Sequence, residues 1–300
     1  MVSRHESRNK EKRVCGFLVY RFQHSREFPT YINSKYHMGA FCMEERNEYN
    51  FRGLGILTLC MLLFAVGVWR FGGGATPASS RAGNRELPIY CVDTKKKQVA
   101  LTFDAAWGNE DTQEILSILK KHDVKVTFFM TGGWVEKYPE DVKRILADGH
   151  DLGNHSQNHK NMSRLTNAQC RQELMSVHDK VKELTGYEMF LFRPPYGDYD
   201  NHVITCAKEC GYYSIQWDVD SLDWKNYGVE SVIRTVLEHP HLGNGSVILC
   251  HNGAKDTAGA LEKIILGLKG KGYELVPVSQ LIYREDYHMD AEGRQFSDES

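Results

Sequence analysis

Residues 99–103 (VALTF) form a short run that is apolar except for Thr102, and the carboxylate of Asp104 follows it directly. Short apolar runs of this kind are typical of a strand buried on both faces of a parallel sheet. A helical pattern follows from Asp111, with Ile115 and Leu119 on one face. The order strand then helix predicts the first unit of an α/β fold.

The same alternation continues along the chain. Strands are expected at residues 126–130, 190–192, 213–217, 247–250 and 274–276, and helices at 140–147, 166–185, 201–210 and 257–269. This order predicts parallel strands joined by helical crossovers, in a barrel-like α/β fold. Polar residues directly follow several of these strands, and such folds gather them at the carboxyl-terminal rim, where chemistry takes place.

Length and composition limit the possible classes of protein. The 300 residues are 41% hydrophobic, which is enough for one substantial core. A formal net charge of -2 creates no overall field that would attract nucleic acid, so no nucleic-acid partner is expected. Cysteines that follow residue 70 are odd in number and widely spaced, which argues against a disulfide framework. Cys206 and Cys210 are interpreted as core residues on one helix face.

An uncharged apolar segment lies near the N-terminus. Residues 54–69 (LGILTLCMLLFAVGVW) carry no charge and are bracketed by Arg52 and Arg70. This length suits a short membrane anchor or the core of a signal peptide, and we favour an uncleaved anchor. The excess of Lys and Arg before the segment favours a cytoplasmic N-terminus and an extracellular remainder. Cleavage of the segment would make the remainder a secreted protein.

These features predict five parts of the chain. They are a cytoplasmic or mis-assigned tail (residues 1–52), a membrane anchor or signal segment (53–71), a flexible linker (72–85), a catalytic domain (86–283) and a polar C-terminal tail (284–300). If the natural chain starts at Met43, residues 1–42 are not part of it.

Candidate chemical groups lie in five short motifs. Asp104 ends the first strand, and His155 and His159 are four residues apart, so that one helical turn would present both imidazoles to a metal ion. Arg193 begins a rigid turn (RPPYG), residues 217–224 (WDVDSLDW) place acids beside aromatic rings, and His251 ends another strand. Each motif alone is weak, because isolated histidines and acids are more often structural than catalytic.

Taken in order, the five motifs resemble those of the polysaccharide deacetylases of the NodB-homology carbohydrate esterase family. The resemblance covers roughly residues 99–282, and its flanking pattern is similar to that of bacterial cell-wall and sporulation enzymes. It implies a distorted (β/α) barrel, preceded here by one hydrophobic helix. It also implies metal-dependent removal of acetyl groups from an N-acetylated glycan polymer such as peptidoglycan or chitin.

The resemblance implies catalytic roles for four residues. Asp104 matches the catalytic base and His251 the catalytic acid. Arg193 matches the residue that orients the base, and Asp223 matches the acid that pairs with the catalytic histidine. These roles suit the chemistry, because a carboxylate can take a proton from water and an imidazolium can give one to a leaving amine.

The resemblance also implies the binding residues. His155 and His159 match metal ligands, and zinc is the expected metal because it suits imidazole. Tyr196 matches a residue whose backbone N–H helps to bind the oxyanion, while Trp224 and Leu249 match the walls of the acetyl pocket. The chain contains no GxSxG motif, so a serine-esterase mechanism has no support.

The chain departs from the family pattern at Ala105, where the family has an aspartate that supplies the third metal ligand. An acid here would face the histidines if Asp104 faces the substrate, because side chains alternate along a strand. Asp111 is an alternative ligand, although an acid at a helix N-terminus is commonly structural. Two functions follow: a deacetylase with a modified metal site, or a wall-glycan-binding or morphogenetic protein without turnover. Retention of Asp104 and His251 favours the deacetylase.

Overall fold

The computed structural model describes residues 81–82 and 84–298. The predicted tail, the hydrophobic segment and most of the linker lie outside the described residues, so the expectations about them stay predictions. Among the residues that are described, no helix is both long and apolar enough to cross a membrane.

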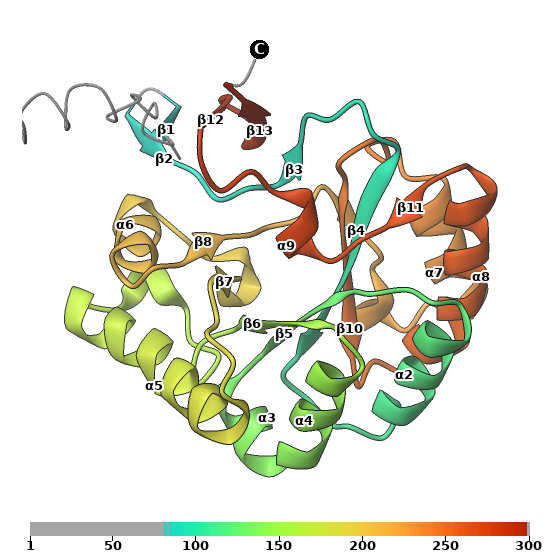
Figure 1. The fold of residues 1–300 in the computed structure, drawn as a ribbon, viewed down its shortest axis with the longest axis horizontal. Coiled ribbons are helices and arrows are strands. Elements are labelled where there is room, and N and C mark those ends of the chain that lie inside the picture. Colours follow the sequence, from blue (N-terminus) through green and yellow to red (C-terminus); the bar gives the residue numbers. More distant parts are fainter. Residues whose placement is uncertain (1–80, 83, 299–300) are drawn as a thin grey trace, which may run out of the picture. The chain divides into compact units, whose positions relative to one another are not determined.

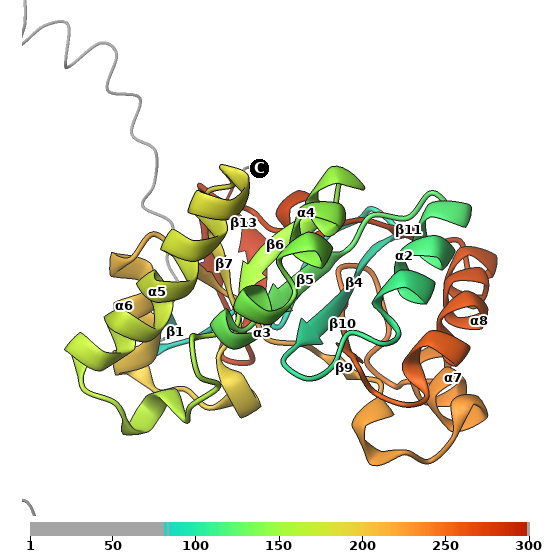
Figure 2. The same cartoon turned by 90° about the horizontal axis from the view of Figure 1, so that it is seen from below.

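A sheet of parallel strands organises the domain (Figures 1 and 2). Its strands are β4 (Gln98–Ala105), β5 (Thr127–Met130), β6 (Asp151–Asn154), β7 (Leu191–Phe192), β8 (Tyr213–Ser214), β9 (Val219–Asp220), β10 (Val247–Asn252) and β11 (Glu274–Leu275). They run in the order β8-β7-β6-β5-β4-β10-β9, and β11 also pairs with β4. The sheet is curled and open, so the predicted distorted α/β barrel is confirmed.

Helices cover the outer side of this sheet, as Figure 2 shows for α5, α3, α4, α2 and α8 in turn. Their bounds are α2 (Thr112–Lys121), α3 (Gly132–Lys137), α4 (Pro139–Ala147), α5 (Asn167–Thr185), α6 (Asn201–Glu209), α7 (Val229–Leu237), α8 (Thr257–Gly270) and α9 (Val278–Leu281). Helix α5 begins with a capping box between Thr166 and Gln169 and ends at Gly186, whose φ is 76°. These end signals explain why its bounds were predictable.

Strand β6 was not expected, because its sequence (DLGN) lacks an apolar run. All four residues are nevertheless buried between β5 and β7. A Cβ atom on Gly153 would lie 2.4 Å from the ring of Phe129, so glycine is needed where the two strands pack. Helices α3 and α7 were also missed.

The C-terminal segment folds against the start of the domain. Strands β12 (Tyr287–Met289) and β13 (Arg294–Ser297) form a small sheet with β3 (Cys91–Val92), and β1 (Arg81–Ala82) pairs with β2 (Arg85–Glu86) (Figure 1). Tyr287 and Met289 are buried there. Residues 287–297 therefore do not form the expected polar tail, because alternate side chains of β12 pack into the core.

Candidate functional site

The carboxyl ends of the strands surround a cavity of about 440 Å³. Asp104 and His251 are direct partners in the β4–β10 ladder, and His155 follows β6. Seven of the nine predicted site residues line the cavity: Asp104, His155, His159, Tyr196, Trp224, Leu249 and His251. The other two, Arg193 and Asp223, are fully buried behind the cavity wall.

Arg193 holds Asp104 in place. Its Nη1 donates to Asp104 Oδ1 at 2.7 Å and to Thr102 Oγ1 at 2.9 Å, and its Nη2 donates to the carbonyl of Gln216 at 3.1 Å. The guanidinium also lies 4.1 Å from the ring centre of Phe129. Burial alone would raise the pKa of Asp104, but the charges of Arg193 and the nearby histidines outweigh it, so this pKa is lowered. Asp104 is therefore ionised at neutral pH, as a base requires.

Asp223 orients His251. One carboxylate oxygen lies 2.7 Å from His251 Nδ1, and the other accepts from the backbone N–H of His251 at 2.7 Å and from Thr257 Oγ1 at 2.6 Å. Burial disfavours the imidazolium, but the hydrogen bond and charge of Asp223 outweigh burial and raise the pKa of His251. The ring is thus held in the protonated form over a wider pH range, which suits a general acid.

The Asp223→Asn substitution should lower the pKa of His251, because it removes the charge that offsets burial. The imidazolium would then lose its proton at lower pH. The alkaline limb of the pH–activity profile would also shift to lower pH. An NMR titration of the His251 ring measures this shift without depending on turnover. An unchanged pKa would contradict the role of Asp223.

His155 and His159 are adjacent, but they do not lie on a helical turn as the spacing had suggested. They occupy the loop after β6, where Ser156 and His159 have φ values of 63° and 53°. The side-chain oxygen of Ser156 accepts from the backbone N–H of His159 at 3.0 Å, and the two imidazole centres are 4.9 Å apart. The prediction of a helix was wrong because a left-handed residue ends helical geometry.

The buried imidazole of His155 is a neutral acceptor. Its Nδ1 donates to the carbonyl of Arg193 at 2.7 Å, and burial lowers its pKa to about 4. The lone pair of Nε2 therefore faces Asp104 Oδ2, 3.5 Å away. Burial also lowers the pKa of His159. His155 Nε2 and Asp104 Oδ2 are both acceptors, and two acceptors that face each other favour a cation between them.

The described residues nevertheless do not complete the metal centre that the resemblance implies. Within residues 81–82 and 84–298, no three His, Cys, Asp or Glu side chains are grouped so that they could hold a metal ion. The described residues supply two imidazoles to this site, whereas catalytic zinc sites usually have three protein ligands.

Ala105 does not face the histidines. Its side chain is fully buried in the cluster between sheet and helices, together with Phe103 and Ile115. Asp104 lies on the opposite side of β4, near His155. The expectation that position 105 and the two imidazoles share one side of the strand is therefore wrong for this backbone.

Asp111 also has a structural role. Its carboxylate accepts from Asn252 Nδ2 at 2.6 Å and from the backbone N–H of Gly253 at 2.9 Å. These bonds tie the loop after β4 to the end of β10. Asp111 is therefore a loop anchor and not the missing ligand.

Trp107 is a cavity residue whose role the sequence motifs did not indicate. Its indole stacks on the imidazole of His251, with ring centres 5.1 Å apart, and 49% of the residue is exposed. The sequence did carry a signal for this role, because the tryptophan follows the predicted base Asp104 closely, on the loop after the strand. The exposed face of the indole provides an apolar surface at the cavity mouth.

Tyr196 lies across the cavity in an unusual conformation. Its φ of 61° and ψ of 8° are left-handed values that non-glycine residues rarely adopt. Its ring contacts His159 with centres 4.5 Å apart. Strained residues of this kind cluster at ligand-binding sites.

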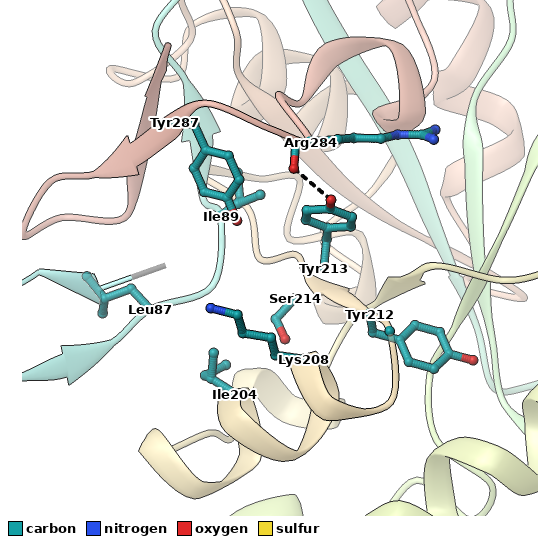
Figure 3. A pocket seen from close by; sticks show the side chains of 10 residues that line it. Leu87, Ile89, Ile204, Lys208, Tyr212, Tyr213, Ser214, Arg284 and Tyr287 are labelled. Carbon is teal, nitrogen blue, oxygen red and sulfur yellow. Dashed lines mark hydrogen bonds between the residues drawn. The ribbon is translucent and has the colours of Figure 1, made fainter. Parts of the chain in front are cut away.

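A separate cavity of about 200 Å³ contains none of the predicted site residues (Figure 3). Lys208 of α6 and Tyr287 of β12 project toward it from opposite sides, and Ser214 of β8 lies beside Lys208. Lys208 is exposed and has no side-chain hydrogen bond or ion pair within the described part of the chain.

Comparison with known proteins decides the family. The sequence profile described as polysaccharide deacetylase matches residues 91–215. The peptidoglycan-N-acetylmuramic acid deacetylase PdaA of Bacillus subtilis is 35% identical over 209 residues, which cover 67% of this chain and 77% of PdaA. The chain belongs to the polysaccharide deacetylase family. The resemblance inferred from the motifs, and the class of carbohydrate N-deacetylases that it implied, are thereby confirmed.

Solved structures of family members share the fold. A peptidoglycan N-acetylglucosamine deacetylase named Bc1960 is 35% identical, with a TM-score of 0.62 over 65% of this chain and 92% of that one. A Bacillus anthracis protein described as a CE4 family pseudoenzyme is also 35% identical, with a TM-score of 0.62 over 65% of this chain and 68% of that one. A mutant of this pseudoenzyme is described as having restored enzymatic activity. The family therefore includes both active and inactive members.

Proposed function

We propose that this chain hydrolyses N-acetyl groups of an amino-sugar polymer. The observation that carries the proposal is the pairing of Asp104 and His251 in one cavity. The pKa of the carboxyl is lowered and that of the imidazole is raised, so the base is ionised and the acid is protonated at the same pH. Groups whose environments separate their pKa values in this way are suited to general acid–base catalysis.

These two residues account for both proton transfers. Asp104 takes a proton from water as the water oxygen bonds to the acetamide carbonyl carbon. His251 then gives its proton to the amide nitrogen as the C–N bond breaks, which releases acetate and a free amine. Arg193 and Asp223 position the base and the acid, and Trp224 and Leu249 line the space for the acetyl group.

We propose peptidoglycan as the polymer. The named relatives deacetylate N-acetylmuramic acid or N-acetylglucosamine units of peptidoglycan. Trp107, Tyr196 and Trp224 surround the cavity mouth with exposed rings, which suit the apolar faces of sugars. Mass spectrometry of glycan fragments treated with the full chain should locate a free amino group on one type of sugar. Unmodified fragments from both peptidoglycan and chitin would contradict this proposal.

We also propose that a divalent cation, zinc first among the candidates, binds at His155 and His159 with fewer protein ligands than usual. His155→Ala or His159→Ala should weaken metal binding by about 10-fold or more, because each variant removes one of two imidazoles. Calorimetric titration with zinc measures the affinity, and His150→Ala is a control, since this buried histidine instead accepts from the backbone N–H of Val126. Equal metal content in all variants would refute the site.

A second function is favoured by Ala105. Without a third ligand, the domain would bind wall glycan without turnover, as a morphogenetic protein or a pseudoenzyme. The Bacillus anthracis protein described as a CE4 family pseudoenzyme is 35% identical to the chain. Retention of glycan binding by a wild-type protein that releases no acetate would identify this second function.

We propose an extracellular location for the domain, either anchored in the membrane by residues 53–71 or secreted after their cleavage. The support is the apolar sequence of this segment and a substrate that lies outside the cell. If protease added to intact cells leaves the domain uncut, this location is contradicted.

A further inference from the structure

The turn after β9 presents three side chains beside the cavity. Leu222 and Asn226 bracket it with left-handed φ values of 56° and 53°, and a short helical turn lies between them. Trp224 is 46% exposed and Tyr227 is 66% exposed, and Lys225 lies between them in the sequence. We call Trp224, Lys225 and Tyr227 the Lys225 platform.

The catalytic machinery fixes the position of this platform. Asp223, which orients His251, begins the turn, and its carbonyl accepts from the backbone N–H of Asn226 at 3.3 Å. At the other end, the backbone N–H of Gly228 donates to Asp256 Oδ2 at 2.9 Å. The turn is therefore tied to the rest of the domain through Asp223 at one end and Gly228 at the other, which places the platform beside the acid.

The ammonium of Lys225 lies near two aromatic rings and has no acidic partner among the described residues. Its Nζ is 5.0 Å from the ring centre of Trp224 and 5.9 Å from that of Tyr227. No ion pair or side-chain hydrogen bond of Lys225 occurs within the described residues. The rings attract the cation, but they leave its three donors free for a ligand.

The charges of the cavity limit what the platform can bind. Asp104 and Asp220 line the cavity and repel a negatively charged ligand, and the imidazolium of His251 offsets only one of these two charges. An anionic group is therefore accepted only where a cation offsets this repulsion. Lys225 provides that cation next to Trp224, one wall of the acetyl space. A neutral polymer such as chitin carries no charge that could pair with the Lys225 ammonium.

We propose that the Lys225 platform is a binding site for a carboxylate on the sugar next to the one whose acetamide enters the cavity. This inference rests on the proposed function and narrows its substrate to amino-sugar polymers that carry carboxylates. Stacking on Trp224 and Tyr227 orients the sugar, and Lys225 selects the charge.

Calorimetry with two glycans of equal length tests the proposal. The ligands are chitotetraose, which is neutral, and a tetrasaccharide of alternating N-acetylglucosamine and N-acetylmuramic acid, which carries free carboxylates. The full chain is compared with Lys225→Gln, Lys225→Glu and the control Lys208→Gln. Lys208 is also an exposed lysine, but it lines the separate cavity in Figure 3.

Lys225→Gln should bind the acidic tetrasaccharide about 2- to 5-fold more weakly, which is the range for an exposed ion pair. Lys225→Glu should bind it more weakly still, because like charges repel. Added salt, or amidation of the carboxylates, should remove the difference. Binding of chitotetraose by the variants and of both glycans by Lys208→Gln should match the wild type.

Equal binding of the acidic tetrasaccharide by the wild type and Lys225→Glu would overturn the proposal. An equal loss of chitotetraose binding in the Lys225 variants would also overturn the proposal, because Lys225 would then contact the glycan whether or not it carries a charge. If the wild type binds neither glycan, the proposed function fails together with this inference.

Discussion

Asp104→Asn should lower acetate release by about 100- to 10,000-fold while glycan binding persists. The amide has the shape of the carboxylate, so it can occupy the same place beside Arg193, but it cannot take a proton from water. Acetate quantification on peptidoglycan measures turnover, and sedimentation with the insoluble polymer measures binding.

Asp148→Asn is the matched control, because Asp148 is part-exposed after α4 and does not line the cavity. Its acetate release should equal that of the wild type. Near-parental activity in Asp104→Asn would show that the proton is taken elsewhere. Loss of binding together with turnover would show that Asp104 is needed to shape the site.

Arg193→Met should destabilise the fold by about 3–5 kcal/mol, because it leaves Asp104 buried without its partner. Burial would then raise the pKa of Asp104, which the guanidinium now keeps low. A carboxyl with a lowered pKa adds stability above its unfolded pKa and loses that contribution on acidification. The difference in free energy of unfolding between Arg193→Met and the wild type should therefore shrink as the pH falls.

Chemical denaturation at neutral and acidic pH measures this effect. Arg171→Met is the control, because Arg171 is exposed and its ion pair with Glu209 spans 3.8 Å at the surface. Its free energy of unfolding should change by less than about 0.5 kcal/mol. If Arg193→Met changes the free energy of unfolding as little as Arg171→Met does, the buried pair of Arg193 and Asp104 does not hold the site together.

The sequence predicted those parts of the structure that depend on local patterns. Residues 99–103 are mostly apolar, as a strand buried on both faces requires, and the strand end places Asp104 at the rim. The capping signals of α5 are equally local. The resemblance then supplied partners for Asp104 that no local pattern contains, and the structure places Arg193 and His251 beside it.

Features that depend on long-range packing were not predictable. Strand β6 is recognisable only from its neighbours, because Gly153 fits against Phe129. The pairing of β13 with β3 joins two ends of the domain, so residues 287–297 looked like a tail. The orientation of Ala105 and the loop conformation of His159 likewise follow from the fold and not from spacing.

The amount of acetate released from purified peptidoglycan by the full chain, in the presence of zinc, cobalt or nickel, tests the central claim most directly. We expect acetate release with at least one of these metals, its loss on chelation and its recovery when the metal is restored. No acetate with any of the metals, from a folded protein that still binds the polymer, would contradict the assignment as a deacetylase.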